Sequence, residues 1–172
     1  MKTTRELEKS IRRLIVFFIV ALVLSGITAF CIESELEWIV ATLPMHNGWL
    51  YKWLQKVHYA VKDVNDRYPF MAYGYDWLAF AHLVIAVAFI GPLREPVKNI
   101  WVIQFGCLAC IMIFPLALIA GFVRRIPFVW QMIDCSFGLI GLIPLLACYG
   151  KIRILEKATR FKVSTQIKTH NI

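Results

Sequence analysis

The chain has 172 residues, of which 59% are hydrophobic, and its mean hydropathy is +0.64. Soluble domains average about 45–50% apolar residues, so this composition excludes an ordinary soluble domain and indicates a membrane protein. The net charge of +8 does not indicate nucleic-acid binding, because the basic residues gather at the chain ends and beside apolar runs.

The first apolar run predicts a membrane helix over residues of about 12–32. A basic segment, residues 1–13, precedes it, but the run is too long for a signal peptide and no small-residue cleavage site follows. Ser25, Gly26 and Thr28 form a small-residue patch in this segment. Such a patch lets a second helix approach closely, so we expect a packing role for it.

Residues 33–74 form a long connection, predicted to be periplasmic. It opens with Glu33, Glu35 and Glu37, and Pro44 and the Asn47-Gly48 pair mark breaks. From Trp49 to Asn65 the apolar residues recur at steps of three and four, which predicts an amphipathic helix. Because its Trp and Tyr residues favour the membrane interface, we expect it to lie on the bilayer or across the mouth of the bundle.

A second membrane helix is predicted over residues 75–92, and it carries Asp76 at its start and His82 well inside. A charged side chain at the centre of a bilayer costs about 2.5–3.5 kcal/mol on insertion scales. Asp76 and His82 therefore need partners, water or a function. The two side chains do not share a helix face, because six residues separate them.

The third and fourth membrane helices are predicted over residues 99–123 and 127–149, with Arg124 and Arg125 in the turn between them. Pro115 removes a backbone hydrogen bond from the third helix and predicts a kink. The fourth helix carries Gln131 and Asp134. The tail, residues 150–172, is basic and predicted to be cytoplasmic.

The positive-inside rule sets the predicted orientation. With both termini in the cytoplasm, 13 Lys and Arg residues lie on the cytoplasmic side and 6 on the other side. Arg124 and Arg125 then lie on the outer side, where they could pair with acidic residues of the connection or with lipid phosphate.

This orientation predicts a polar layer in the outer half of the helices. His82 lies seven residues past Tyr75, and Asp134 lies seven residues past Pro127, so each is about 10 Å deep in the same leaflet. Ligand candidates in this layer are Asp76, His82, Gln131, Asp134, Arg124 and Arg125. The functional hypothesis is a proton relay or oriented ligand made by His82 and Asp134, and the alternative is an interhelical hydrogen bond for packing.

Metal binding and redox chemistry remain alternatives. Metal ligands could come from His82, Asp134, His58 and Glu35, although no spacing matches a zinc signature. Cys107 and Cys110 form a C-x-x-C pattern typical of disulfide exchange. That pair lies inside an apolar helix with no basic neighbour, which favours small core cysteines instead.

The sequence therefore predicts an all-α, single-domain integral membrane protein, residues 1–172. We expect a four-helix bundle with one amphipathic interfacial helix between the first and second spans, placed in the inner (plasma) membrane with both termini cytoplasmic. The predicted role is non-catalytic: binding of a lipid, a hydrophobic ligand or a partner at the outer polar layer. The alternative is a membrane-embedded enzyme, redox or metal protein that uses His82 and Asp134 or Cys107 and Cys110. No cofactor is predicted, nucleic acid is not an expected partner, and a homo-oligomer is one of the possible assemblies.

Overall fold

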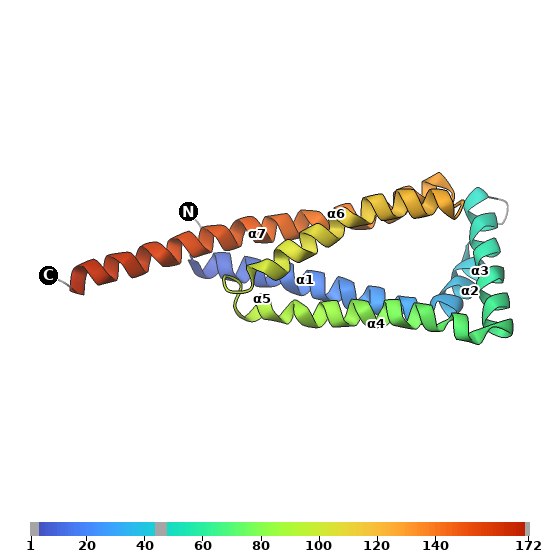
Figure 1. Ribbon diagram of the computed structural model, residues 1–172, viewed down its shortest axis with the longest axis horizontal. Coiled ribbons are helices and arrows are strands. Elements are labelled where there is room, and N and C mark those ends of the chain that lie inside the picture. Colours follow the sequence, from blue (N-terminus) through green and yellow to red (C-terminus); the bar gives the residue numbers. More distant parts are fainter. Residues whose placement is uncertain (1–3, 44–47, 171–172) are drawn as a thin grey trace. The chain divides into compact units, whose positions relative to one another are not determined.

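A computed structural model describes residues 4–43 and 48–170, with side chains described as far as residue 160. These residues contain helices and turns and no strand. The elements are α1 (Thr4–Phe30), α2 (Ile32–Thr42), α3 (Trp49–Arg67), the 3₁₀ turn η1 (Pro69–Met71), α4 (Tyr73–Ala88), α5 (Ile90–Arg94), α6 (Ile100–Val123) and α7 (Phe128–His170) (Figure 1). The prediction of a helical chain is confirmed for the described residues.

Four of the described helical segments are long and apolar enough to cross a membrane. They are Thr4–Phe30, Pro69–Arg94, Ile100–Val123 and Phe128–Arg160. These segments overlap the four predicted spans, so the predicted number of membrane-length helices is confirmed for the described residues. The predicted break at Pro44 and Asn47 lies outside the described residues.

The chain divides into two compact units. The connection unit is Val20–Ala86, and the hairpin unit consists of Met1–Ile19 together with Val87–Ile172. The connection unit contains the end of α1, then α2, α3, η1 and most of α4. The hairpin unit contains the start of α1, then α5, α6 and α7.

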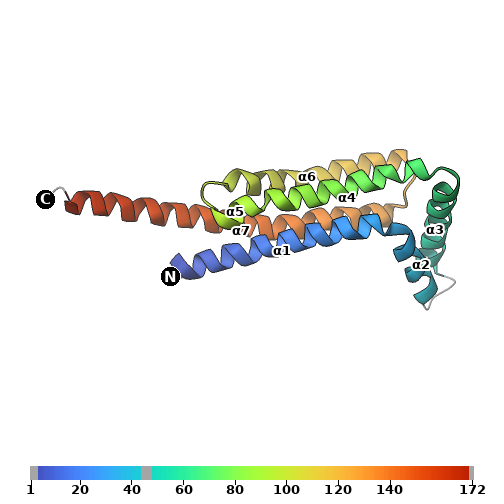
Figure 2. The same ribbon diagram turned by 90° about the horizontal axis from the view of Figure 1, so that it is seen from below.

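In the connection unit, α2 and α3 pack side by side (Figure 2). Leu36 of α2 and Leu54 and Val61 of α3 are buried. No helix was predicted at residues 32–42, which fall almost wholly in the predicted long connection. Glu33 and Glu35 lie in the first turn of α2, where negative charge is favoured by the exposed backbone N–H groups.

The end of α1 packs against α4 in the same unit. A Cβ atom at Gly26 would lie 3.0 Å from the carbonyl oxygen of Ala79 and 3.3 Å from the Cβ of His82. The predicted close approach at the small-residue patch is therefore confirmed at Gly26, whereas Ser25 and Thr28 are exposed.

In the hairpin unit, α6 and α7 form an antiparallel pair. Glycines allow this close contact, because a Cβ atom at Gly138 would lie 2.8 Å from the carbonyl oxygen of Cys110. At Gly141 a Cβ atom would lie 3.0 Å from the Sγ of Cys110 and 3.4 Å from Phe18. Pro115 lies inside α6, and the kink predicted there stays a prediction.

Two helices extend beyond the predicted spans. Helix α1 begins at Thr4 rather than near residue 12, because Leu7, Ile11 and Ile15 form a buried stripe at four-residue spacing. Ser10 of this segment accepts a 2.8 Å hydrogen bond from the Nζ of Lys151 on α7.

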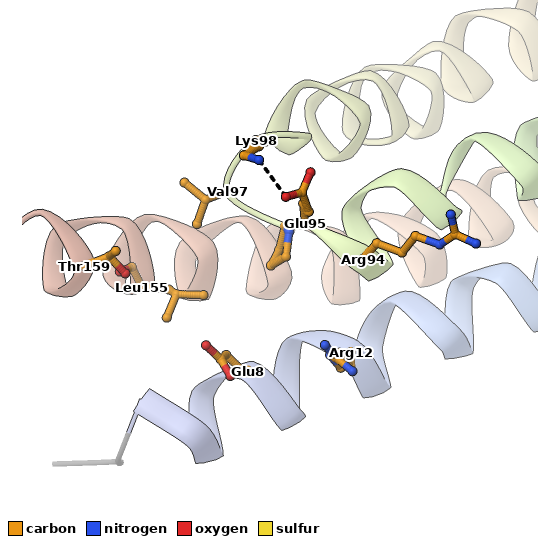
Figure 3. A pocket seen from close by; sticks show the side chains of 9 residues that line it. Glu8, Arg12, Arg94, Glu95, Val97, Lys98, Leu155 and Thr159 are labelled. Atoms are coloured by element: carbon orange, nitrogen blue, oxygen red, sulfur yellow. Dashed lines mark hydrogen bonds and ion pairs between the residues drawn. The ribbon is translucent and has the colours of Figure 1, made fainter.

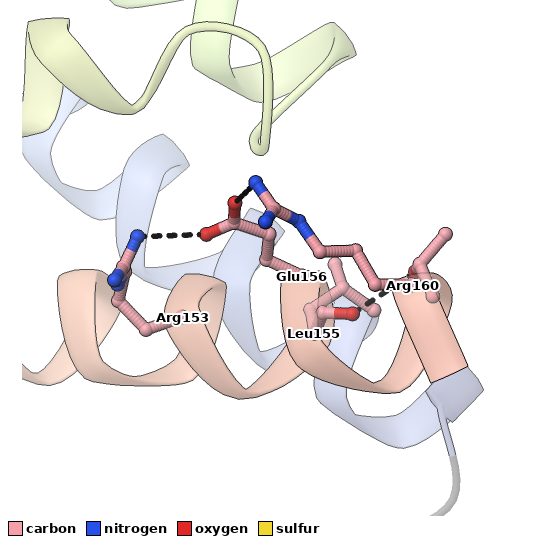
Figure 4. A network of polar contacts seen from close by, with 5 residues as sticks. Arg153, Leu155, Glu156 and Arg160 are labelled. Carbon is pink, nitrogen blue, oxygen red and sulfur yellow. Dashed lines mark hydrogen bonds and ion pairs between the residues drawn. The ribbon is translucent and has the colours of Figure 1, made fainter. Parts of the chain in front are cut away.

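Helix α7 continues through the predicted tail without a break at Gly150. Glu156 accepts from Arg153 at 2.8 Å and from Arg160 at 2.7 Å, so three residues of one helix form a charged network (Figure 4). Pairs at this spacing each stabilise a helix by about 0.2–0.5 kcal/mol.

The second membrane-length segment is made of two helices. Helix α4 ends at Ala88, and Gly91 and Pro92, where the second span was predicted to end, lie in the first turn of α5. A proline is tolerated in a first turn because its missing N–H has no partner there. The side chain of Asn99 closes this segment, since its Nδ2 donates to the carbonyl oxygens of Gly91 and Glu95, each at 3.1 Å.

Candidate functional site

Two adjoining pockets lie in the connection unit, and both are lined by Asp76. The acidic pocket has a volume of about 370 Å³ and lies at the end of α1, where Phe30, Glu33, Asn65 and Tyr75 also line it. Asp76 is exposed in the first turn of α4. Within the described residues it has no hydrogen bond from a side chain and no ion pair, so its carboxylate is available to a ligand.

The aromatic pocket has a volume of about 280 Å³ and shares Phe30 and Asp76 with the acidic pocket. Its other walls are Tyr73, Trp77 and Phe80 of α4. These three residues follow one another at steps of four and three, so α4 presents them on one face. The ring centroids of Tyr73 and Trp77 are 5.8 Å apart, and those of Trp77 and Phe80 are 5.9 Å apart, both edge to face.

Asn65 lines the acidic pocket and contacts one of its carboxylates. Its Nδ2 donates to the Oε2 of Glu33. A carboxylate only accepts hydrogen bonds, so the NH₂ group must face Glu33 and the carbonyl oxygen must turn away. This Oδ1 atom is buried and has no hydrogen-bond partner among the described residues.

His82 is half-buried on α4 in the connection unit. Its Nδ1 lies 2.8 Å from the carbonyl oxygen of Leu78, and since a carbonyl can only accept, Nδ1 carries the proton. The predicted partner Asp134 belongs to the hairpin unit, where it is half-buried and has no hydrogen bond or ion pair among the described residues. The pairing of His82 with Asp134 stays a prediction.

Three further ligand candidates, Arg124, Arg125 and Gln131, lie in or beside the turn between α6 and α7. Arg124 is the C-cap of α6, and Arg125 follows with a left-handed φ of 56°. The N–H of Ile126 donates to the carbonyl of Gly121 at 2.9 Å, which together with Arg125 makes a Schellman motif. Both arginine side chains are exposed, and within the described residues neither forms an ion pair.

The side chain of Gln131 is hydrogen-bonded to this turn. It is only 8% exposed, and its Nε2 donates to the carbonyl oxygen of Ile126 at 2.8 Å. The side chain fits against Gly121, where a Cβ atom would lie 2.6 Å from its Cδ. The amide nitrogen of Gln131 is therefore occupied by the fold, which gives this residue a structural task.

The metal and redox candidates are spread over several elements. Among the described residues, no group of three or more His, Cys, Asp and Glu side chains is arranged to hold a metal ion. Glu35 lies on α2, and His58 lies on α3 with a buried Nε2 that has no hydrogen-bond partner in the described part of the chain. Cys107 and Cys110 are free thiols, and Cys110 is buried where α6 meets Gly138 and Gly141.

A third pocket, of about 290 Å³, lies in the hairpin unit (Figure 3). Glu8 and Arg12 of α1 and Arg94 of α5 line it, together with Glu95 and Lys98, which form a 2.6 Å ion pair. Acidic and basic side chains are mixed here, with three bases and two acids, so the lining has only a small positive excess.

Asp76 is one of the predicted ligand candidates, whereas Asn65 and the aromatic walls were not predicted. The spacing of Tyr73, Trp77 and Phe80 is visible in the sequence and could have predicted one aromatic face. The contact of Asn65 with Glu33 could not, because 32 residues separate them.

Compared with protein-family models, with curated proteins and with solved structures, the chain finds no match.

Proposed function

We propose that the chain is a small polytopic inner-membrane protein that binds a lipid or another hydrophobic ligand at its outer side and has a non-catalytic role. Its four long helices support membrane insertion. In their most apolar windows only 17–22% of the residues are buried. On α6 alone, Phe105, Met112 and Ile119 are exposed, and such apolar surface is unstable in water.

In this proposal α3 is the interfacial helix and both termini are cytoplasmic. Buried Leu54 and Val61 face α2, while Lys52, Lys56 and Lys62 are exposed, which suits a helix at the edge of a bilayer. The cytoplasmic excess of Lys and Arg supports the orientation.

The observation that carries the binding role is the pair of pockets around Asp76. They combine apolar aromatic walls with a few converging polar groups, which is the usual composition of a small-molecule site. Asp76 opens the second membrane span, so an amphiphile in the outer leaflet can reach these pockets from the bilayer.

The Arg124–Arg125 turn gives the proposal a second contact, with lipid phosphate. A left-handed residue costs about 1–2 kcal/mol unless it is glycine, and Asn or Asp is the next choice. Arg125 has this left-handed conformation, is exposed and has no ion-pair partner in the described residues. Its guanidinium group therefore suits the binding of a phosphate group.

Native mass spectrometry of the protein extracted in a mild uncharged detergent tests this function. The wild type is expected to retain a lipid or another apolar molecule. Ala72→Phe is expected to remove it, because Ala72 lines the acidic pocket and the larger side chain fills that space.

Gly74→Ala is the matched control in the same segment, since a Cβ atom at Gly74 has no atom within 4 Å. Retention by this variant should equal that of the wild type. A wild type that carries no bound molecule, or an Ala72→Phe variant that retains as much as the control, contradicts the proposed function.

The proposed orientation has a separate test in spheroplasts. In a chain whose native cysteines are replaced by serine or alanine, Lys98→Cys should be protected from an impermeant thiol reagent, and Arg124→Cys should be labelled. The opposite labelling pattern would reverse the topology.

A further inference from the structure

We infer that the pockets around Asp76 bind an amphiphilic organic cation, with its charged head against the carboxylate and its apolar body on the aromatic walls. This inference rests on the proposed function and names the ligand class of that site. It is carried by the acceptor chemistry of one pocket and the aromatic lining of the other.

The acidic pocket offers acceptors without matching donors. Asp76 and Glu33 supply two carboxylates, and Asn65 lies beside Glu33 in the same lining. No Lys or Arg lines this pocket among the described residues. An ammonium group with N–H donors would offset both negative charges.

The aromatic pocket supplies the second, independent observation. Phe30, Tyr73, Trp77 and Phe80 surround Asp76, and the faces of aromatic rings attract cations. Tyr73 and Trp77 pack edge to face with an interplanar angle of 85°, and Trp77 and Phe80 do so with an angle of 88°. Rings held at such angles can present a face and an edge to the same ligand.

The dimensions favour an organic cation over a bare ion. The two pockets measure about 370 and 280 Å³ and meet at Phe30 and Asp76. A liquid water molecule occupies about 30 Å³, so each pocket is many times larger than a single ion. Phe, Tyr and Trp walls also provide no ligands that a hard metal ion prefers. A ligand with a charged end at Asp76 and an apolar end along Trp77 uses both pockets.

Isothermal titration calorimetry in uncharged detergent provides the test. The probes are tetraphenylphosphonium, a cation, and tetraphenylborate, an anion of nearly the same size and shape. Tetraphenylphosphonium is expected to bind the wild type at least tenfold more tightly than tetraphenylborate. Equal binding of the two probes, or tighter binding of the anion, overturns the inference.

Two variants locate the binding. Asp76→Asn keeps the shape of the side chain and removes its charge, and we expect it to weaken tetraphenylphosphonium binding about tenfold. Trp77→Leu removes one ring face and should weaken binding about fivefold. Glu37→Gln, an exposed acid on α2, and Trp101→Leu, an exposed tryptophan on α6, are matched controls outside both pockets and should bind like the wild type.

The outcomes separate this inference from the proposed function. If Ala72→Phe loses the co-purified molecule while Asp76→Asn binds tetraphenylphosphonium like the wild type, the cation assignment falls and the binding role stands. If the wild type retains no molecule and binds neither probe, both fall. Circular dichroism of each variant checks that its helix content equals that of the wild type, and Asp76→Glu provides a charged rescue if Asp76→Asn loses helix content.

Discussion

Gly138 should be the most sensitive small residue in the contact between α6 and α7. In Gly138→Ala the new Cβ atom would lie 2.8 Å from the carbonyl oxygen of Cys110 and 3.3 Å from the Cβ of Ile113. Carbon and oxygen normally approach to about 3.3–3.6 Å, so the helices must separate by about 0.5–0.8 Å. The obstacle is backbone, which cannot rotate away, and overpacking of this kind costs about 1–3 kcal/mol.

Gly150→Ala isolates this cost, because it makes the same chemical change in the same helix where a Cβ atom has no atom within 4 Å. Each variant gains about 1 kcal/mol of helix propensity, so the difference between their free energies of unfolding should be about 1–3 kcal/mol. Gly141→Ala should fall between them, because the sulfur of Cys110 can move.

The assay is reversible unfolding of the purified protein by sodium dodecyl sulfate in mixed micelles, followed by far-ultraviolet circular dichroism. Equal free energies of unfolding for Gly138→Ala and Gly150→Ala would refute the close backbone contact. A Gly141→Ala variant less stable than Gly138→Ala would refute the assignment of the obstacle to the Cys110 backbone.

Three further predictions concern the polar residues of the spans. Gln131→Leu should lower the free energy of unfolding by about 1 kcal/mol in the same assay, because the carbonyl oxygen of Ile126 loses its hydrogen bond; an unchanged value would mean that the turn does not depend on this bond. Arg125→Gly should raise the free energy of unfolding by about 1 kcal/mol by relieving the left-handed residue, yet lower the retention of anionic lipid in native mass spectrometry. His82→Cys combined with Asp134→Cys, in a chain without native cysteines, should form a disulfide on oxidation if the two side chains face each other, and no cross-link would contradict that pairing.

The membrane-length helices could be predicted because each is marked by a local signal, a long run of apolar residues. The shorter elements could not. Helix α2 follows α1 after a single residue, Cys31, whose φ of −103° and ψ of 20° break the helix. No glycine or proline marks that point, so the sequence carries no sign of a new element there. The short helix α5 was not predicted either, because the sequence does not tell whether the proline at position 92 opens or ends a helix.

The candidate site could be predicted only in part. Asp76 was visible as a carboxylate at the start of an apolar run, and that local signal needs no partner to be recognised. Its surroundings depend on how α3 packs against α2, which brings Asn65 to Glu33. The packing of these two helices does not follow from the hydrophobic pattern.

The polar residues of the apolar helices differ in whether their own helix can satisfy them. Thr28 and Ser136 donate to carbonyl oxygens three residues earlier, at 3.0 and 2.6 Å, and His82 donates to a carbonyl oxygen four residues earlier. A carboxylate has no proton to give, so Asp76 and Asp134 cannot be satisfied in this way.

The functional candidates differ in the same way. Thr28, Ser136 and His82 have a local explanation for their presence in an apolar segment, and each could remain there without any ligand. An ionised aspartate needs a donor from free backbone N–H groups at a helix start, from another element, from water or from a bound molecule. Asp76, which lines two pockets and has no ion-pair partner among the described residues, is therefore the residue at which a ligand is first expected.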